Sequence, residues 1–170
     1  MCIRDRGVSF TYTFDKRVEI TGNAKIKLWM QAQGAEDMDV FVRYYKVNAN
    51  GARMFSDDGM GRYYGPQGKL RVSHRMLDAE RSTLLKPVHK HTEEKKLREG
   101  EIVVIEIPIW PTGLVFEQGQ TLKLDISARD YVEDRPPHMI ETTNINRGKH
   151  VLYAGGAYDS CIVLPVCADS

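Results

Sequence analysis

The chain has 170 residues, of which 24 are lysine or arginine and 23 are aspartate or glutamate, so its net charge is +1. Proteins that bind nucleic acid or an anionic membrane surface need a basic face, and this balanced composition gives no sign of one. We therefore expect neither partner. No apolar run approaches the ~20 residues of a membrane-spanning helix. A chain of this length is expected to form one domain with a core of its own.

Alternation of apolar and polar residues, which is typical of half-buried strands, recurs along most of the chain. It predicts about eight strands separated by turn residues. In chain order they cover residues 8–14, 24–32, 40–47, 70–72, 103–109, 122–126, 151–153 and 162–166. Short strands without long helical periods indicate an all-β fold, an antiparallel β-sandwich of two sheets with one or two short helical turns.

The strand pattern also predicts where the domain begins. It starts only at Val8, so residues 1–7 are interpreted as a leader, either non-native or a linker, ahead of a single domain over 8–168. One helical turn or a short helix is expected within 75–85, where Asp78 can support the first turn. The three cysteines provide no disulfide framework, which slightly favours the cytoplasm and leaves the compartment open.

Prolines and long loops interrupt the pattern. Pro108 and Pro111 suit a strand at a sheet edge and the exit from that strand, because proline cannot donate a ladder hydrogen bond. Two long loops are expected at about 83–100, which is charged and contains histidines, and at about 128–150. Loops of this length are uncommon unless they are functional or pack against another surface.

A search for catalytic patterns finds no nucleophile. No serine lies in the Gly-x-Ser-x-Gly pattern of a hydrolase elbow. Serine, histidine and aspartate occur close together twice, a combination that any β domain offers by chance: Ser73 with His74 and Asp78, and Ser160 with His150 and Asp159. We expect no catalytic residue and no cofactor.

Two binding functions remain open as alternatives. His89 and His91 lie on the same side of an extended segment, as in a zinc site, but further ligands would have to come from Glu93 and Glu94 of the same charged loop, so no metal is expected. Trp29 lies on the polar side of its strand and is the best candidate for an exposed ring in a sugar-binding groove. Large rings also pack cores and domain interfaces, which is the simpler interpretation.

Several segments, taken in order, resemble one family. They are similar to the C-terminal domain of X-Pro dipeptidyl-peptidases and of the cocaine-esterase-like (CocE/NonD) acyl hydrolases. The segments are Phe10–Phe14, Val18–Gly22, Ala24–Trp29, Gly68–Arg75, Val104–Ile107, Trp110–Thr112, Val115–Gln120 and Gly155–Ser160. The resemblance covers nearly everything from residue 8 to residue 166, and it implies a jelly-roll (galactose-binding-like) sandwich.

The resemblance also implies a function. In such enzymes an upstream α/β-hydrolase domain holds the catalytic serine, aspartate and histidine, so no catalytic position has a counterpart in this chain. We expect the chain to pack on that missing domain, to stabilise it and to help wall its active site; a homo-oligomer is a further option. The rival function is a free-standing carbohydrate-binding module. Charged loop residues are the candidates for domain docking, namely His74, Arg75, Arg81, His89 and His91.

Overall fold

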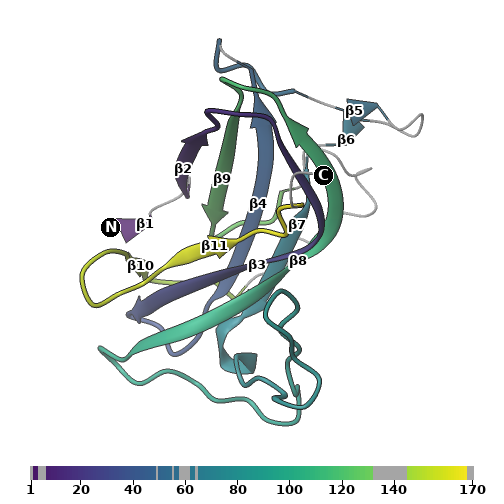
Figure 1. Cartoon of the computed structure of the whole chain (residues 1–170). Helices are drawn as coiled ribbons and strands as arrows, with labels where there is room; N and C mark the ends of the chain where they lie inside the picture. The colour runs from purple at the N-terminus through teal and green to yellow at the C-terminus, as the bar shows by residue number, and fades with distance from the viewer. Residues whose placement is uncertain are drawn as a thin grey trace.

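Two antiparallel sheets face each other as the layers of a β-sandwich (Figure 1). The computed structural model describes residues 2–3, 7–48, 50–54, 56–57, 62–63, 65–131 and 145–167. Its elements are β1 (Cys2–Ile3), β2 (Val8–Thr13), β3 (Val18–Gln33), β4 (Asp39–Val47), β5 (Ser56–Asp57), β6 (Arg62–Tyr63), β7 (Gln67–Arg71), the 3₁₀ turn η1 (Val72–His74), β8 (Ile102–Phe116), β9 (Thr121–Ser127), β10 (Lys149–Tyr153) and β11 (Cys161–Val163). The predicted all-β sandwich is confirmed. No described segment forms a helix with the length and hydropathy needed to cross a membrane.

The strand β3 is the centre of the first sheet. It pairs along one edge with β8, and its other edge is shared by β10 and β11. The short strand β1 extends this sheet beyond β10. The second sheet has the order β2-β9-β4-β7, and β5 and β6 form a separate hairpin. Because β2, the pair β4 and β7, and β9 alternate in the chain with strands of the first sheet, the chain crosses repeatedly between the two layers.

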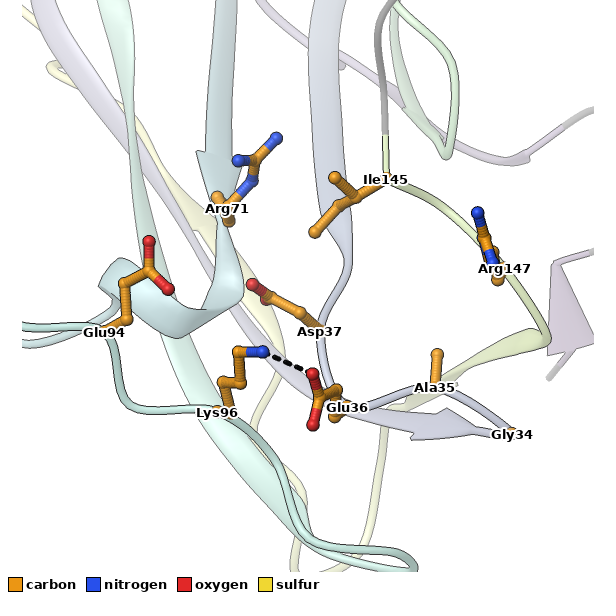
Figure 2. Close-up of a pocket in the computed structure, with 9 residues that line it drawn as sticks. All are labelled: Gly34, Ala35, Glu36, Asp37, Arg71, Glu94, Lys96, Ile145 and Arg147. Carbon is orange, nitrogen blue, oxygen red and sulfur yellow. Dashed lines mark hydrogen bonds and ion pairs between the residues drawn. The ribbon is translucent and has the colours of Figure 1, made fainter.

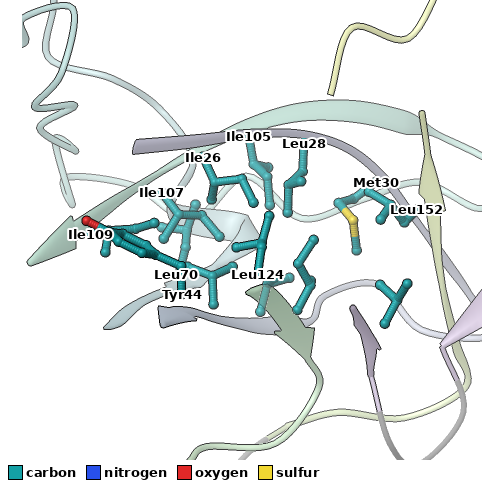
Figure 3. Close-up of a cluster of buried hydrophobic side chains, with 14 of the residues drawn as sticks. Ile26, Leu28, Met30, Tyr44, Leu70, Ile105, Ile107, Ile109, Leu124 and Leu152 are labelled. Atoms are coloured by element: carbon teal, nitrogen blue, oxygen red, sulfur yellow. The ribbon is translucent and has the colours of Figure 1, made fainter. Parts of the chain in front are cut away.

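The core lies between the two sheets, and both contribute aliphatic side chains to it (Figure 3). The alternation along each strand places every second residue in this layer, which is why the period of two in the sequence identified most core positions. Fully burying one such side chain contributes about 1.5–3 kcal/mol. The labelled members are Ile26, Leu28, Met30, Tyr44, Leu70, Ile105, Ile107, Ile109, Leu124 and Leu152.

Strand β4 is buried on both faces. Its outer face holds Arg43, whose side chain is 3 % exposed. The guanidinium of Arg43 lies 4.0 Å from the ring centroid of Tyr131 and 5.5 Å from that of Tyr45. Tyr131, which follows β9, therefore covers this strand from outside, in agreement with the almost continuously apolar or aromatic sequence of β4.

The strands β3 and β8 are longer than the sequence pattern predicts. Their register shifts between Gly22 and Ala24, which pair with Thr112 and Ile109. The residues at 110 and 111 on β8 therefore oppose a single residue of β3, as in a β-bulge. The prediction that the strand ends at Pro111 was wrong, because the bulge accommodates a residue that cannot donate to the ladder.

The proline at position 108 lies where the sequence predicts, on a strand at the edge of a sheet. Pro108 pairs with Lys25 of β3, and among the described strands β8 has only this one neighbour in its sheet. The proline nitrogen can therefore face the unpaired edge without loss of a hydrogen bond.

The start of the sheet differs from the sequence prediction, whereas the turn at Asp78 agrees with it. The sheet starts before Val8, because Cys2 of β1 pairs with Val151 of β10. The expected turn is present, since the Asp78 carboxylate accepts hydrogen bonds from the backbone N–H groups of Glu80 and Arg81. It stays a single turn rather than a helix.

Candidate functional site

The connection between η1 and β8, residues 75–101, is a long loop whose shape is fixed by its own hydrogen bonds. The backbone N–H of Asp78 donates to the carbonyl of Val88 at 2.8 Å, and that of Lys90 donates to Met76 at 3.0 Å. Further along, the side chain of Leu97 is buried in the core. The loop is therefore a defined surface, which Figure 1 shows below the sheets.

The structure brings three of the predicted docking residues together on this surface. The ring centroids of His74 and His91 lie 5.4 Å apart, and those of His89 and His91 lie 5.8 Å apart. A nitrogen of His89 is 3.0 Å from the backbone carbonyl of Glu106, on the open edge of β8. Burial lowers the pKa of His89 below its ordinary value of 6.5, and the charges of the two neighbouring imidazoles would lower it further. His89 thus attaches the loop to the sheet, whereas His91 is exposed.

The other two predicted residues differ from each other. The guanidinium of Arg75 donates to the carbonyls of Val72 and Lys95 and lies 3.9 Å from the Glu101 carboxylate, so it holds the loop together from within. Arg81 lies on the turn after Asp78 and is exposed. Of this pair, Arg81 is therefore the one whose side chain faces solvent.

Sequence analysis missed the most exposed apolar residue of the loop. Leu84 is 75 % exposed. It follows Arg81 closely and precedes Lys86 in an otherwise polar segment. The signal was present, because Leu84 and Leu85 form an isolated apolar pair in a charged loop. A single exposed apolar side chain is ordinary on a protein surface, so Leu84 adds to the candidate docking residues only because it lies in the same loop as they do.

Beside the loop, an open pocket of about 540 Å³ separates it from the end of β3 (Figure 2). Acidic and basic groups line it in equal number, so the pocket has no preference for one sign of charge. A dashed line in Figure 2 marks the ion pair between Lys96 and Glu36. The charged lining residues are Glu36, Asp37, Glu94, Arg71, Lys96 and Arg147.

Two of the charged groups near this pocket have structural partners. The buried Asp37 carboxylate accepts hydrogen bonds from the backbone N–H groups of Met38 and Ser73, both at 2.9 Å, which ties the start of β4 to η1. Arg71 donates two hydrogen bonds to Asp39, at 2.8 and 3.0 Å, and this contact raises the pKa of the guanidinium. These residues hold the sandwich end in place rather than forming a reactive site.

The serine, histidine and aspartate combinations do not assemble. The Ser73 hydroxyl is buried without a hydrogen-bond partner and so is not bonded to the adjacent His74. The Ser160 hydroxyl donates to the carbonyl of Tyr153 at 2.6 Å. A serine nucleophile needs a base within hydrogen-bond reach. The residues that the structure describes therefore place no such base on either serine, and they contain no group of three potential ligands that could hold a metal ion.

The candidate sugar-binding ring is already engaged. The indole N–H of Trp29 donates to the Asp159 carboxylate at 2.8 Å, and the indole packs edge-on against Tyr158. The same carboxylate accepts a hydrogen bond from Lys27 at 2.7 Å, and these two contacts lower the pKa of Asp159. Trp29 is partly covered by these neighbours, so it does not form the open platform that a sugar ring would require.

Comparison with known proteins identifies the domain. Residues 4–163 match the family model of the X-Pro dipeptidyl-peptidase C-terminal non-catalytic domain. None of the curated proteins compared with the chain is similar to it.

Solved structures give the same result. A CocE/NonD family hydrolase from Staphylococcus aureus superposes with a TM-score of 0.88 at 38 % identity, over 95 % of this chain and 30 % of the hydrolase chain. An α-amino acid ester hydrolase, at 16 % identity and a TM-score of 0.64 over 96 % of this chain and 26 % of its own, shares the fold. An aminopeptidase from a marine sediment Thaumarchaeota archaeon does so too, at 12 % identity and a TM-score of 0.65 over 97 % and 26 %.

This chain thus spans about a third or less of the hydrolases that it matches. The β-sandwich fold, the superposition on the S. aureus hydrolase and the family match agree with one another. The chain belongs to the family of X-Pro dipeptidyl-peptidase C-terminal non-catalytic domains.

Proposed function

We propose that this domain packs on an upstream α/β-hydrolase domain, stabilises it and contributes the loop 75–101 to the wall of its active site. The observation that supports this most is the match to a C-terminal non-catalytic domain that makes up only 30 % of a similar hydrolase chain. A domain of this kind has no reaction of its own to perform, so its contribution is to binding and stability.

The loop 75–101 supports the proposal because it combines fixed shape with exposed groups. Ordering so many residues outside the sheets costs about 1–2 kcal/mol of backbone entropy for each residue, which the loop's internal hydrogen bonds and the burial of Leu97 offset in part. Contact with a neighbouring domain would offset that cost. Interfaces between domains of one chain are fairly polar, which suits a surface of imidazole, guanidinium and one large apolar side chain.

The proposed docking residues have different roles. Arg81, His91 and Leu84 face solvent and would contact the catalytic domain directly. Arg75 and His89 would act indirectly, because their bonds to backbone carbonyls set the loop shape. His74 would also help to position the loop, since its imidazole lies 3.7 Å from the Glu94 carboxylate.

The whole protein would then be a serine hydrolase that cleaves an X-Pro dipeptidyl amide or an acyl ester. In that reaction a serine hydroxyl, activated by histidine, forms an acyl-enzyme that water releases, and an oxyanion hole stabilises the intermediate. Every one of those groups would belong to the catalytic domain. The loop 75–101 of this domain would affect how substrate enters the active site and how it binds there.

Steady-state kinetics of the full-length protein with p-nitrophenyl esters and X-Pro p-nitroanilides test the proposal. Leu84→Asp should lower kcat/KM by about tenfold, as expected for loss of one buried contact at a domain interface. Val166→Asp, which also changes an exposed aliphatic residue, is the matched control and should behave as the unmodified protein. Equal kinetics for both variants would contradict a role of the loop at the active site. Turnover by the isolated chain, lost on a Ser→Ala substitution, would contradict the accessory role altogether.

A further inference from the structure

We propose that the apolar pocket beneath β2, at the open side of the sandwich, receives an apolar side chain of the catalytic domain in the full-length protein. The inference rests on the proposed function and goes further, because it names a second surface through which the two domains meet.

The pocket has a volume of about 210 Å³ and opens between the two sheets. Side chains from the five strands β2, β3, β9, β10 and β11 line it, and none of the lining residues is charged. The large aliphatic and aromatic lining residues of these strands are Phe10, Ile26, Leu28, Leu124, Ile126, Leu152 and Ile162. A pocket for a sugar or an ion needs several converging polar groups. This lining instead suits an aliphatic or aromatic side chain.

Strand β2 shows that a cover is missing. Val8, Phe10 and Tyr12 lie on one face of the strand, opposite core residues of β9. Val8 is 6 % exposed, as expected for that face, but Phe10 is 42 % and Tyr12 is 61 % exposed. The described part of the chain therefore leaves the middle of β2 uncovered on its core-facing side. Two neighbouring rings left in solvent on the inner face of a sandwich strand indicate a place where another surface packs.

The position of β1 supports the upstream domain as the occupant. Strand β1 pairs with β10, with Cys2 opposite Val151, and the next residue of β10, Leu152, lines the pocket. A polypeptide that enters the domain from the N-terminal side therefore passes beside the pocket. Because the matched domain is C-terminal and forms 30 % of the similar S. aureus chain, most of such a protein lies on that side.

Covalent connection also favours the catalytic domain over a second copy of this chain. A domain joined by a short linker is present at an effective concentration on the order of millimolar, so a small apolar contact suffices to hold it. A second copy would have to associate from dilute solution through a pocket that admits only one or two side chains. The same pocket is therefore far more readily filled from within the polypeptide.

Thiol labelling at position 10 tests this directly. Phe10→Cys and Val104→Cys are made separately, with Cys2, Cys161 and Cys167 changed to serine, in the isolated chain and in the full-length protein. Val104 is the matched control, because it is 40 % exposed and lies on β8. Maleimide labelling is followed by mass spectrometry of the corresponding peptides. In the isolated chain both positions should react at similar rates, and in the full-length protein labelling at position 10 should slow by about tenfold or more while position 104 is unchanged.

The outcomes separate the pocket from the broader proposal. Equal labelling at position 10 in both proteins would overturn the pocket assignment, and protection of Leu84→Cys in the same experiment would then leave the docking function standing. Lack of protection at both positions would reject docking as well. Protection at position 10 that grows with the concentration of the isolated chain would assign the pocket to a second copy and also overturn the inference. If Phe10→Cys fails to fold by circular dichroism, Tyr12→Cys provides the same measurement.

Discussion

Strands β2 and β4 both pair with β9 and lie on either side of it in one sheet, yet their surroundings differ. Nearly all of β4 is buried, on the inner face by the opposite sheet and on the outer face by Tyr131 and neighbouring groups. On β2 only Val8 is buried, although its sequence alternates as regularly as that of a core strand. Regular pairing of a strand with its neighbour therefore does not ensure that the side chains of that strand are buried. Under our proposal, the strand that lacks a cover is the place where an upstream domain packs.

Removal of a ring from the fully covered strand should have the largest effect on stability. Tyr44 is completely buried on the inner face of β4. Truncation of a buried aromatic residue to alanine costs about 3–5 kcal/mol, because it removes apolar contact and leaves a cavity. Tyr44→Ala in the isolated chain should lower the free energy of unfolding by that amount in urea titrations. A loss below about 1 kcal/mol would contradict the packing described for β4.

The outer cover of β4 depends on a buried cation. The Arg43 guanidinium lies against two aromatic rings and 3.7 Å from the Asp125 carboxylate. Arg43→Ala should destabilise the chain by about 2 kcal/mol, because it removes this stacking and one partner of the carboxylate. Arg43→Lys keeps the charge but loses the planar group, and it should recover only part of the stability. Full recovery would show that charge alone, and not stacking, holds the outer cover.

The uncovered strand should tolerate the same type of change. Phe10→Ala in the isolated chain should cost about 1 kcal/mol or less, because nearly half of the ring is already in solvent. The cost should increase in the full-length protein, where the proposed partner covers it. Urea titrations of both proteins provide the comparison. An equal loss of unfolding free energy in the isolated chain and in the full-length protein would contradict the proposal that a partner covers β2.

The smallest effect should be a dependence of stability on pH. Burial lowers the pKa of both His89 and His150 below 6.5, so the unfolded chain binds more protons than the folded chain just below that pH. Stability should therefore fall as the pH decreases from 6.5 through the folded-state pKa values and then level off with respect to these groups. His89→Gln and His150→Gln should each reduce the slope between pH 7 and pH 5 in urea titrations. A slope unchanged in both variants would assign the dependence to other groups.

Much of the fold follows from the sequence because alternation is a local property. The period of two identified the core positions of β3, β8 and β9, and a family resemblance implied the jelly-roll sandwich. The bulge opposite position 23 could not be predicted, since it depends on the register between two strands far apart in sequence. The same is true of Phe10, whose pattern predicts burial while its exposure depends on which strands lie across from it.

The proposed docking surface was predictable only in part. Charged residues in a long loop indicated a contact region, and His91 and Arg81 do face solvent. The anchoring roles of Arg75 and His89 depend on backbone carbonyls of other segments, which side-chain identity does not reveal. Leu84 could have been found from the sequence, because it forms an apolar pair with Leu85 inside a polar loop.

Thermal unfolding of the catalytic domain, measured in the full-length protein and in a version that lacks this domain, tests the central claim most directly. If the domain stabilises its partner through a polar interface, removal should lower the unfolding midpoint of the catalytic domain by several degrees, about 2–4 °C for each kcal/mol of interface energy. Hydrolysis of p-nitrophenyl esters should fall in parallel. An unchanged midpoint together with unchanged hydrolysis would contradict the claim that this domain supports a hydrolase.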